Sequence, residues 1–410
     1  MIFKEKLTSV VTIISCLLMA AFFISPALMS ISLASLLLIG LVSFSKNTLS
    51  LDDKSLKPLL FASIAYFLIL LISMFISNNE VEAQRKFILK LPIALMPMLF
   101  FSLRKLTLKQ ISIIVLVFVF FVYLTGSISS LVYLQNKEYF DDLILQAKPI
   151  PILFGYGIYH IQFSVLNALS VLVGFYFAIK NYSKLPFIIP FSLLLFSSIN
   201  LLNLHVLSAR TGLFGFYLSL FVMVSFYGVK VWETSKKKFL LGLLLFLFLP
   251  ILFVFISPSL QNRIKNTNED IQTITENLNP NDKSVAMRVE AWKTAITLLE
   301  NNPLGIGLGN VEEQMQFQYE KNKTLLTEQN RKNPHNQFLE TALQMGIQGL
   351  VVFLVLLFLY FRYYAKSPIG FAILSLFIFS FLVESMLERQ VSIAAWVFFI
   401  PFTYFLNKTE

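Results

Sequence analysis

Three histidines are the side chains best suited to proton transfer near neutral pH in this chain, and each lies at the edge of an apolar run. His335 stands in "NPHNQFLE", between a long polar segment and the apolar run that begins at residue 336. An imidazole can take a proton from a hydroxyl, so His335 is a candidate general base. For His205, in "NLLNLHVLSAR", an ordinary interfacial histidine is the better interpretation.

Two arginines occupy positions that suit phosphate recognition. Arg210 opens an apolar run in "SARTGLFGF", where a cation at membrane depth is costly and is usually paired or functional. Arg288 lies in "KSVAMRVEAWKTAITLLENN", a pattern that predicts an amphipathic helix. The apolar face of that helix is expected to consist of Val285, Val289, Trp292, Ile296 and Leu299. A guanidinium suits a phosphate well, but Arg288 could equally extend toward lipid phosphates at the membrane surface.

Further charged side chains fall at the ends of apolar runs. Lys90 enters a run in "KFILKLPIALMP", and "FLVESMLERQVS" carries Glu384, Glu388 and Arg389. For Glu388, a local ion pair in a solvated loop is the favoured interpretation. Several cations together with a histidine would hold a pyrophosphate, stabilise it as a leaving group and deprotonate an acceptor hydroxyl. No carboxylates have the spacing of metal ligands, and the single cysteine, Cys16, excludes a cysteine cluster, so no metal is expected.

The glycine-rich motif "PLGIGLGN", residues 303–310, predicts a tight turn at which two backbones approach closely. It has no preceding strand and no following Lys-Ser/Thr pair. A phosphate-binding loop is therefore not indicated.

The composition requires lipid as the solvent for most of the chain. Hydrophobic residues make up 56% of the 410 positions and only 14% are charged, so a soluble domain could not bury the apolar surface. The apolar runs are continuous rather than alternating, which favours helices over barrel strands. The first run is expected to be a retained span and not a signal peptide. We predict an all-α integral membrane protein with about twelve transmembrane helices, near 8–25, 27–45, 57–77, 87–103, 110–134, 161–179, 185–204, 211–229, 239–257, 336–361, 368–387 and 391–406.

The basic residues predict the orientation of these helices. Lysines and arginines cluster in alternate loops, which places both termini in the cytoplasm by the positive-inside rule. All three histidines then lie at the outer face. The formal charge of +10 is explained by topology, and no nucleic-acid partner is expected. We predict an N-terminal transmembrane bundle of about nine helices at 1–257, one large, partly helical periplasmic loop at 258–335, and about three C-terminal transmembrane helices at 336–410.

Several of these motifs, taken in order, resemble a known family. "SARTGL", "RVEAW" followed by "NNPLGIGLGN", and "PHNQFLETALQMGIQGL" resemble the O-antigen ligase and polymerase superfamily. "KLPIALMP" and "FLVESMLERQ" resemble its Bacteroidetes-type members. The resemblance extends from about Lys90 to the C-terminus. It implies a GT-C-like glycosyltransferase of the bacterial inner membrane that uses an undecaprenyl-pyrophosphate-linked glycan without metal or other cofactor.

The resemblance also implies roles for individual residues. Arg210 and Arg288 are assigned to the pyrophosphate, and His335 to the base or to orienting the acceptor. The same periplasmic site is expected to bind substrate through Lys90, Arg389, Glu384, His160 and Asn336. In a ligase the acceptor is the lipid A core, and in a polymerase it is another lipid-linked glycan. A transporter of lipid-linked sugars is a more distant alternative, which predicts internal repeats and interrupted helices.

Overall fold

The computed structural model describes residues 2–46, 56–146, 148–364 and 367–406, and within these ranges the regular structure is helical. Each predicted apolar run coincides with one helix to within a few residues at its ends; the run at 368–387 extends farthest, because its helix ends at Val383. These helices are α1 (Ile2–Ile24), α2 (Pro26–Lys46), α3 (Leu56–Phe75), α4 (Glu80–Leu103), α5 (Leu108–Gln135), α7 (His160–Lys180), α8 (Ile188–Leu207), α9 (Arg210–Thr234), α10 (Lys236–Ile256), α14 (Gln337–Tyr364), α15 (Pro368–Val383) and α16 (Gln390–Leu406).

The helices have the length and composition of membrane spans. Among the described residues, eight are long and apolar enough to cross a bilayer: α1 to α5, α7, α8 and α14. Shorter apolar helices occur at Arg210–Phe226, Pro368–Val383 and Gln390–Leu406. The chain is thus an all-helical membrane protein, while the crossing of the bilayer by all twelve helices stays a prediction.

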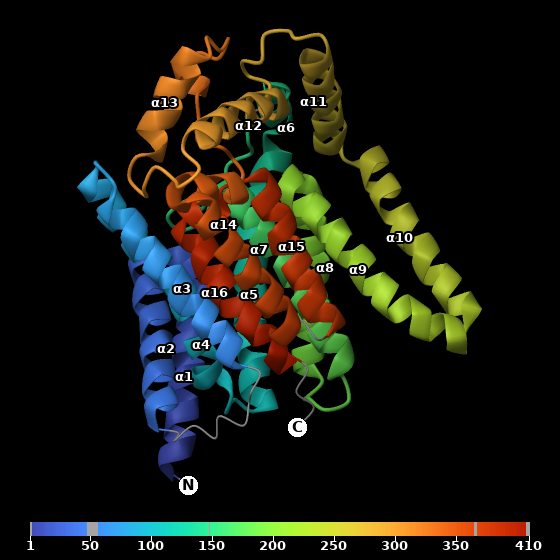
Figure 1. Cartoon of the computed structure of the whole chain (residues 1–410). Helices are drawn as coiled ribbons and strands as arrows, with labels where there is room; N and C mark the ends of the chain where they lie inside the picture. The colour runs from blue at the N-terminus through green and yellow to red at the C-terminus, as the bar shows by residue number, and fades with distance from the viewer. Residues whose placement is uncertain (1, 47–55, 147, 365–366, 407–410) are drawn as a thin grey trace.

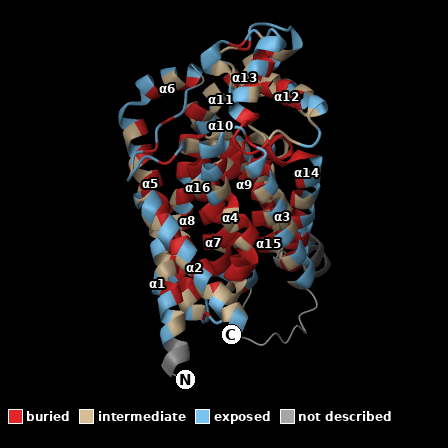
Figure 2. Ribbon diagram, turned by 60° about the vertical axis from the view of Figure 1, so that its left-hand side comes forward, coloured by how far each residue is buried: buried red, intermediate tan, exposed pale blue. Residues whose placement is uncertain are grey.

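Helix α7 forms the centre of the bundle, since 94% of its apolar window is buried. It packs against α5, α8, α9 and α15, so the elements that carry the candidate site share one core. Aromatic side chains fill much of that core: Trp396 of α16 lies 5.1–5.7 Å, centroid to centroid, from the rings of Tyr360, Phe377 and Phe381. The interior of the bundle is buried, and large apolar residues such as Phe61 face outward, as expected for contact with lipid (Figure 2).

Residues 258–335, here called the insertion, form a helical cap on one end of the bundle (Figure 1). The cap contains α11 (Pro258–Thr275), α12 (Ser284–Asn301), α13 (Val311–Lys321) and a short 3-10 helix, η1 (Glu328–Asn330). A further short helix, α6 (Lys137–Leu145), lies beside α11 at the same end. The first turns of α1 and the last turns of α16 lie at the opposite end, an arrangement that agrees with the predicted sidedness.

The amphipathic helix was predicted in the right place but with the wrong buried face. Helix α12 buries mostly small residues, which allow close packing against α11, α13 and α14. The buried residues are Ala286, Ala291, Thr294 and Ala295, together with the larger Leu298. Ile296, which was expected on the apolar face, is 46% exposed. Counting only bulky apolar residues therefore misplaced the contact surface.

The motif at 303–310 packs against a break in α14. At Gly346 the backbone leaves the helical conformation (φ 74°, ψ 179°), and Gly305 also has a positive φ of 91°. A Cβ added to Gly305 would lie 2.4 Å from the backbone nitrogen of Gly346, so the close approach requires glycine. Backbone groups freed by the break pair with the motif: Ile306 N donates to Leu343 O at 2.7 Å, and Ile347 N donates to Pro303 O at 3.0 Å. The predicted tight turn is confirmed.

Candidate active site

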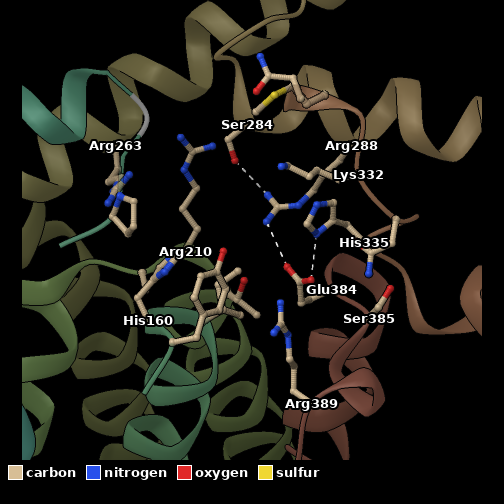
Figure 3. Close-up of a pocket in the computed structure, with 18 residues that line it drawn as sticks. His160, Arg210, Arg263, Ser284, Arg288, Lys332, His335, Glu384, Ser385 and Arg389 are labelled. Carbon is tan, nitrogen blue, oxygen red and sulfur yellow. Dashed lines mark hydrogen bonds and ion pairs between the residues drawn. The ribbon is translucent and has the colours of Figure 1, made fainter. Parts of the chain in front are cut away.

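A cavity of about 440 Å³ lies between the capped end of the bundle and the insertion (Figure 3). Its lining comes from the first residues of α7, α9 and α12, from α11, from the segment before α14 and from the turn between α15 and α16. The cationic side chains that line it are Arg210, Arg263, Arg288, Lys332 and Arg389. Glu384 is the single carboxylate in the lining, so the cavity carries a large excess of positive charge.

Three helices begin at this cavity. Helix α7 starts at His160, α9 at Arg210 and α12 at Ser284, and all three residues are part of the lining. The first N–H groups of a helix have no partner within the helix, and the helix dipole adds a partial positive charge there. The backbone therefore adds to the preference for an anion that the arginines create.

His335 and Glu384 form a hydrogen-bonded pair in the cavity wall. The Nδ1 atom of His335 lies 2.9 Å from Oε1 of Glu384, whose other oxygen lies 3.7 Å from Nη2 of Arg288 (Figure 3). Burial alone would raise the pKa of Glu384, but the hydrogen bond from His335 and the charges of His335 and Arg288 lower it below its ordinary value. An ionised Glu384 accepts a hydrogen bond from the N–H group at Nδ1, which leaves the lone pair of Nε2 available to a hydroxyl.

The backbone of His335 is held in an unusual conformation. Its φ is +47°, a region that residues with a side chain seldom adopt. Asn336 follows and caps α14, since its Oδ1 accepts hydrogen bonds from the backbone nitrogens of Phe338 (2.9 Å) and Leu339 (3.1 Å). The cap fixes the direction in which the chain enters α14, and strain of this kind is frequent at functional sites.

The two arginines predicted to bind phosphate are tied together by an aspartate of the insertion. Arg210 Nη1 donates to Oδ2 of Asp270 at 3.2 Å, and Oδ1 of Asp270 accepts from the backbone nitrogen of Val285 at 3.2 Å. Val285 is in the first turn of α12, the helix that carries Arg288, whose Nη1 donates to Ser284 Oγ at 3.1 Å. Asp270 thus sets the distance between α9 and α12.

Arg263 and Lys332 complete the cationic lining. Burial, and to a lesser extent the nearby charge of Arg210, lower the pKa of Arg263 to about 10. In the part of the chain that the structure describes, neither residue forms an ion pair with a carboxylate. Four side-chain atoms of the lining are buried without a hydrogen-bond partner: the Nε atoms of Arg263 and Arg288, the hydroxyl of Ser385 and Oε2 of Glu384.

Six of the eight residues predicted for the site line the cavity: His160, Arg210, Arg288, His335, Glu384 and Arg389. Asn336 is not part of the lining, because its side chain is engaged in the cap of α14 and donates to Leu382 O at 3.0 Å. Lys90 also lies outside the lining. His205 lies in α8, with Nε2 2.7 Å from Tyr217 Oη and Nδ1 2.7 Å from Leu201 O, in agreement with its interpretation as an ordinary histidine.

Lys90 belongs to a separate set of buried charges, here called the charge cluster. It consists of Lys86, Lys90, Glu340, Gln344 and Glu388. Lys90 donates to Glu388 and Gln344, and Gln344 donates to Glu340 at 2.7 Å. Lys86 lies 3.8 Å from a carboxylate oxygen of each glutamate. The prediction of a solvated local pair for Glu388 is wrong, because its partners come from another helix and its side chain is only 9% exposed.

Residues 191–354 match the family model described as O-antigen ligase. The match runs from α8 through the insertion into α14, so it includes Arg210, Arg288 and His335. A Haemophilus influenzae protein described as uncharacterized is 24% identical over 376 residues, which cover 90% of this chain and 88% of that protein. The predicted resemblance to the O-antigen ligase superfamily is confirmed by the family match.

Proposed function

From residues 191–354, this chain carries a domain of the O-antigen ligase superfamily, and on that premise we propose that it is a ligase of O-antigen glycans. It transfers a glycan from undecaprenyl pyrophosphate to the lipid A core at the periplasmic face of the bacterial inner membrane. The observation that carries the proposal is the cavity itself, with five cations against one carboxylate at one end of a membrane bundle. A pyrophosphate anchored in the membrane by its lipid would meet the protein at such a place.

The cations hold the donor and stabilise the group that leaves. When the bond between the anomeric carbon of the glycan and the pyrophosphate oxygen breaks, that oxygen keeps the electron pair. Arg210, Arg288 and the starts of α7, α9 and α12 neutralise the developing charge. In this proposal the fixed side-chain charges stabilise the leaving pyrophosphate, as a metal ion does in other pyrophosphate chemistry, and the reaction is metal-independent.

His335 activates the acceptor in this mechanism. Its Nε2 atom takes the proton of an acceptor hydroxyl while the hydroxyl oxygen forms the new bond to the anomeric carbon. Glu384 holds the imidazole through Nδ1 and stabilises the imidazolium that results. The products are the glycosylated acceptor and undecaprenyl pyrophosphate, and the proton leaves His335 to water.

A polymerase of O-antigen or exopolysaccharide is the second candidate function. It uses the same lipid-linked donor and leaving group, but its acceptor is another lipid-linked repeat unit. A transporter would account for the break at Gly346, but not for a histidine–glutamate pair beside five cations.

The lipid carrier pool distinguishes ligase from polymerase in cells that lack this protein. Without a ligase, long glycans accumulate on the carrier and the lipopolysaccharide is bare core. Without a polymerase, single repeat units accumulate on the carrier and cores carry one unit each. An unchanged pool with normal surface chains would contradict both functions.

The orientation of the site is tested with cysteine labelling in a Cys16→Ser background. An impermeant thiol reagent added from outside should modify Asn279→Cys, in the insertion, and not Ser235→Cys, between α9 and α10. The reverse pattern would place the cavity in the cytoplasm. It would exclude a periplasmic reaction.

A further inference from the structure

The turn between α15 and α16 faces the cavity on one side and the charge cluster on the other. It contains Glu384, the short 3-10 helix η2 (Met386–Glu388) and Arg389, and α16 begins at Gln390. Glu384, Ser385 and Arg389 line the cavity. Glu388, within the same six residues, contacts Lys90, Lys86 and Gln344 instead.

We propose that Glu388, held by Lys90 of α4, is a positioning residue that places Glu384 against His335 in the transfer reaction. This inference rests on the proposed function, because it assigns Glu388 a part in activating the acceptor hydroxyl. Glu388 itself touches neither the cavity nor the substrate. Glu388 affects proton transfer only by holding the turn that carries Glu384.

The charge cluster connects the turn to two helices. Lys90 and Lys86 come from α4, while Glu340 and Gln344 come from the part of α14 that precedes the break at Gly346. Lys90 is 1% exposed and donates to both Gln344 and Glu388, and Gln344 Nε2 donates to Glu388 Oε2 at 3.2 Å. Two lysines face two glutamates, so the cluster is neutral without a ligand.

The same turn is tied to the residues that directly follow His335. The backbone nitrogen of Leu387 donates to Oε1 of Gln337 at 2.6 Å, and Asn336 Nδ2 donates to Leu382 O at 3.0 Å. Asn336 and Gln337 follow His335 in the chain. The Glu384–His335 hydrogen bond is therefore enclosed by contacts before and after Glu384, and Glu388 provides the contact to a third element, α4.

The turn is short, and its local hydrogen bonds do not determine how it lies against the bundle. A 3-10 helix of three residues holds it internally, through bonds such as Met386 N to Glu384 O at 2.9 Å, and both Glu384 and Arg389 have extended backbones. Its position against the bundle thus depends on tertiary contacts, of which the buried ion pair is the one that reaches α4. Ion pairs of this kind add less to stability than to the choice of one arrangement, and a displacement of about 1 Å at a catalytic group can cost roughly a hundredfold in rate.

A double-mutant cycle tests the inference in proteoliposomes with lipid-linked donor and acceptor. We expect Glu388→Gln to lower kcat by about tenfold with the KM for the acceptor within about twofold, since the groups are displaced and none is removed from the cavity. In a Glu384→Gln background the same change should lower kcat by less than about twofold, because the residue to be positioned is already disabled. Equal losses in both backgrounds, or no loss in either, would overturn the inference.

Glu82→Gln is the matched control. Glu82 is also a carboxylate near Lys86, at 3.9 Å, but it comes from α4 itself and does not contact the turn. We expect its kcat to equal that of the wild type. A tenfold loss in this variant would mean that the charge of the cluster, and not the position of the turn, sets the rate.

A second variant removes both charges in case Glu388→Gln does not fold. The Lys90→Met/Glu388→Met protein leaves no unpaired charge and should keep wild-type yield and thermal stability. If the ion pair positions Glu384, this stable protein still has a kcat lowered by about tenfold; wild-type kcat would overturn the inference. Failure of the proposed function is recognised separately, because His335→Ala would then transfer glycan as well as the wild type.

Discussion

The cavity and the charge cluster are two groups of ionic side chains at the same end of the bundle. The charges of the cluster compensate one another, whereas the cavity has an excess of positive charge. In the charge cluster two lysines meet two glutamates, and a glutamine accepts and donates the remaining hydrogen bonds. In the cavity lining five cations meet one carboxylate, and Arg210 also pairs with Asp270 of α11, which is not part of the lining. Glu384 and Glu388, four residues apart, belong to different groups.

The difference indicates which charges serve the fold and which serve a ligand. In the charge cluster each lysine faces a carboxylate, so the charges are compensated within the protein, and replacing one member of such a pair costs more than replacing both. Uncompensated cations at a membrane protein's polar end lower its stability until an anion binds. Residues that look alike in the sequence, such as Lys90 and Arg389, are therefore expected to respond differently to mutation.

The largest expected effect comes from the cations of the cavity. Arg288→Ala should lower transfer by about a thousandfold or more, since a guanidinium that neutralises the leaving pyrophosphate is lost. Arg210→Ala should behave in the same way. The measurement is glycan transfer per folded protein in proteoliposomes.

Arg85→Ala is the control for a general loss of positive charge. Arg85 lies in the first turns of α4, is exposed and pairs with Glu82 at 2.6 Å, so its replacement should leave transfer unchanged. Arg288→Lys should restore little, because an ammonium cannot form the paired hydrogen bonds of a guanidinium. Near-normal activity of both Arg210→Ala and Arg288→Ala would show that the cavity is not the phosphate site.

The charge cluster should show its largest effect on stability. Lys90→Met removes the hydrogen bonds that Glu388 and Gln344 accept from Lys90, and Glu388 keeps only Lys86, at 3.8 Å, as a cationic partner. We expect a cost of about 3 kcal/mol of unfolding free energy, the low end for a broken buried ion pair. Thermal unfolding in detergent measures the loss. If Lys90→Met proved as stable as the wild type, the cluster would not be a compensated structural group.

The proton-transfer pair should show a smaller catalytic effect than the arginines. His335→Ala should lower kcat by about a hundredfold, the usual cost of losing a general base. Adding Glu384→Gln to that variant should change little further, since Glu384 acts through the imidazole. Wild-type kcat in His335→Ala would assign the base to another residue, and independent losses would separate the two roles.

Sequence patterns predicted the helices well because a membrane span is a local feature. Each apolar run required only its own residues to be identified, and each coincides with one helix apart from a few residues at its ends. The patterns failed where partners are distant in the chain. Nothing in the polar insertion marked Asp270, Arg263 or Lys332 as facing a cavity, and the face of α12 was misplaced because alanines form its contact.

For the charged residues at the ends of the apolar runs, too, the sequence did not show which distant residues are their partners. Arg210, Arg288 and His335 were singled out by position and family resemblance, and the structure brings them together. Lys90 looked similar in the sequence, yet its partners Gln344 and Glu388 lie more than 250 residues away. Lys90 is kept out of the cavity by the tertiary structure. Helix α14 breaks at Gly346, and the turn after α15 packs against α4, so Lys90 contacts Glu388 instead.

The smallest expected effect concerns a cation without an acidic partner. Arg263→Gln should raise the unfolding temperature of the ligand-free protein by about 1–3 °C, because a partly buried guanidinium near the charge of Arg210 is removed. Lys90→Met should change it in the opposite direction, so the two variants compare the cavity and the charge cluster directly. Inorganic pyrophosphate should raise the unfolding temperature of the wild type more than that of Arg263→Gln, since binding to the folded state is linked to stability.

The pH dependence of the Arg263 effect follows from the sign of its pKa shift. The pKa of Arg263 in the folded protein, about 10, lies below that of an unfolded arginine, so the folded state loses its proton first as pH rises. Keeping Arg263 protonated in the folded protein therefore costs stability in full below pH 10, and the cost decreases as pH rises above that value. The difference in unfolding temperature between Arg263→Gln and wild type should shrink from pH 8 to pH 11. A difference that is absent at pH 8, or that reverses sign, would mean that Arg263 is compensated in the folded protein, and the contrast between the cavity and the charge cluster would then depend on Lys332 and Arg389.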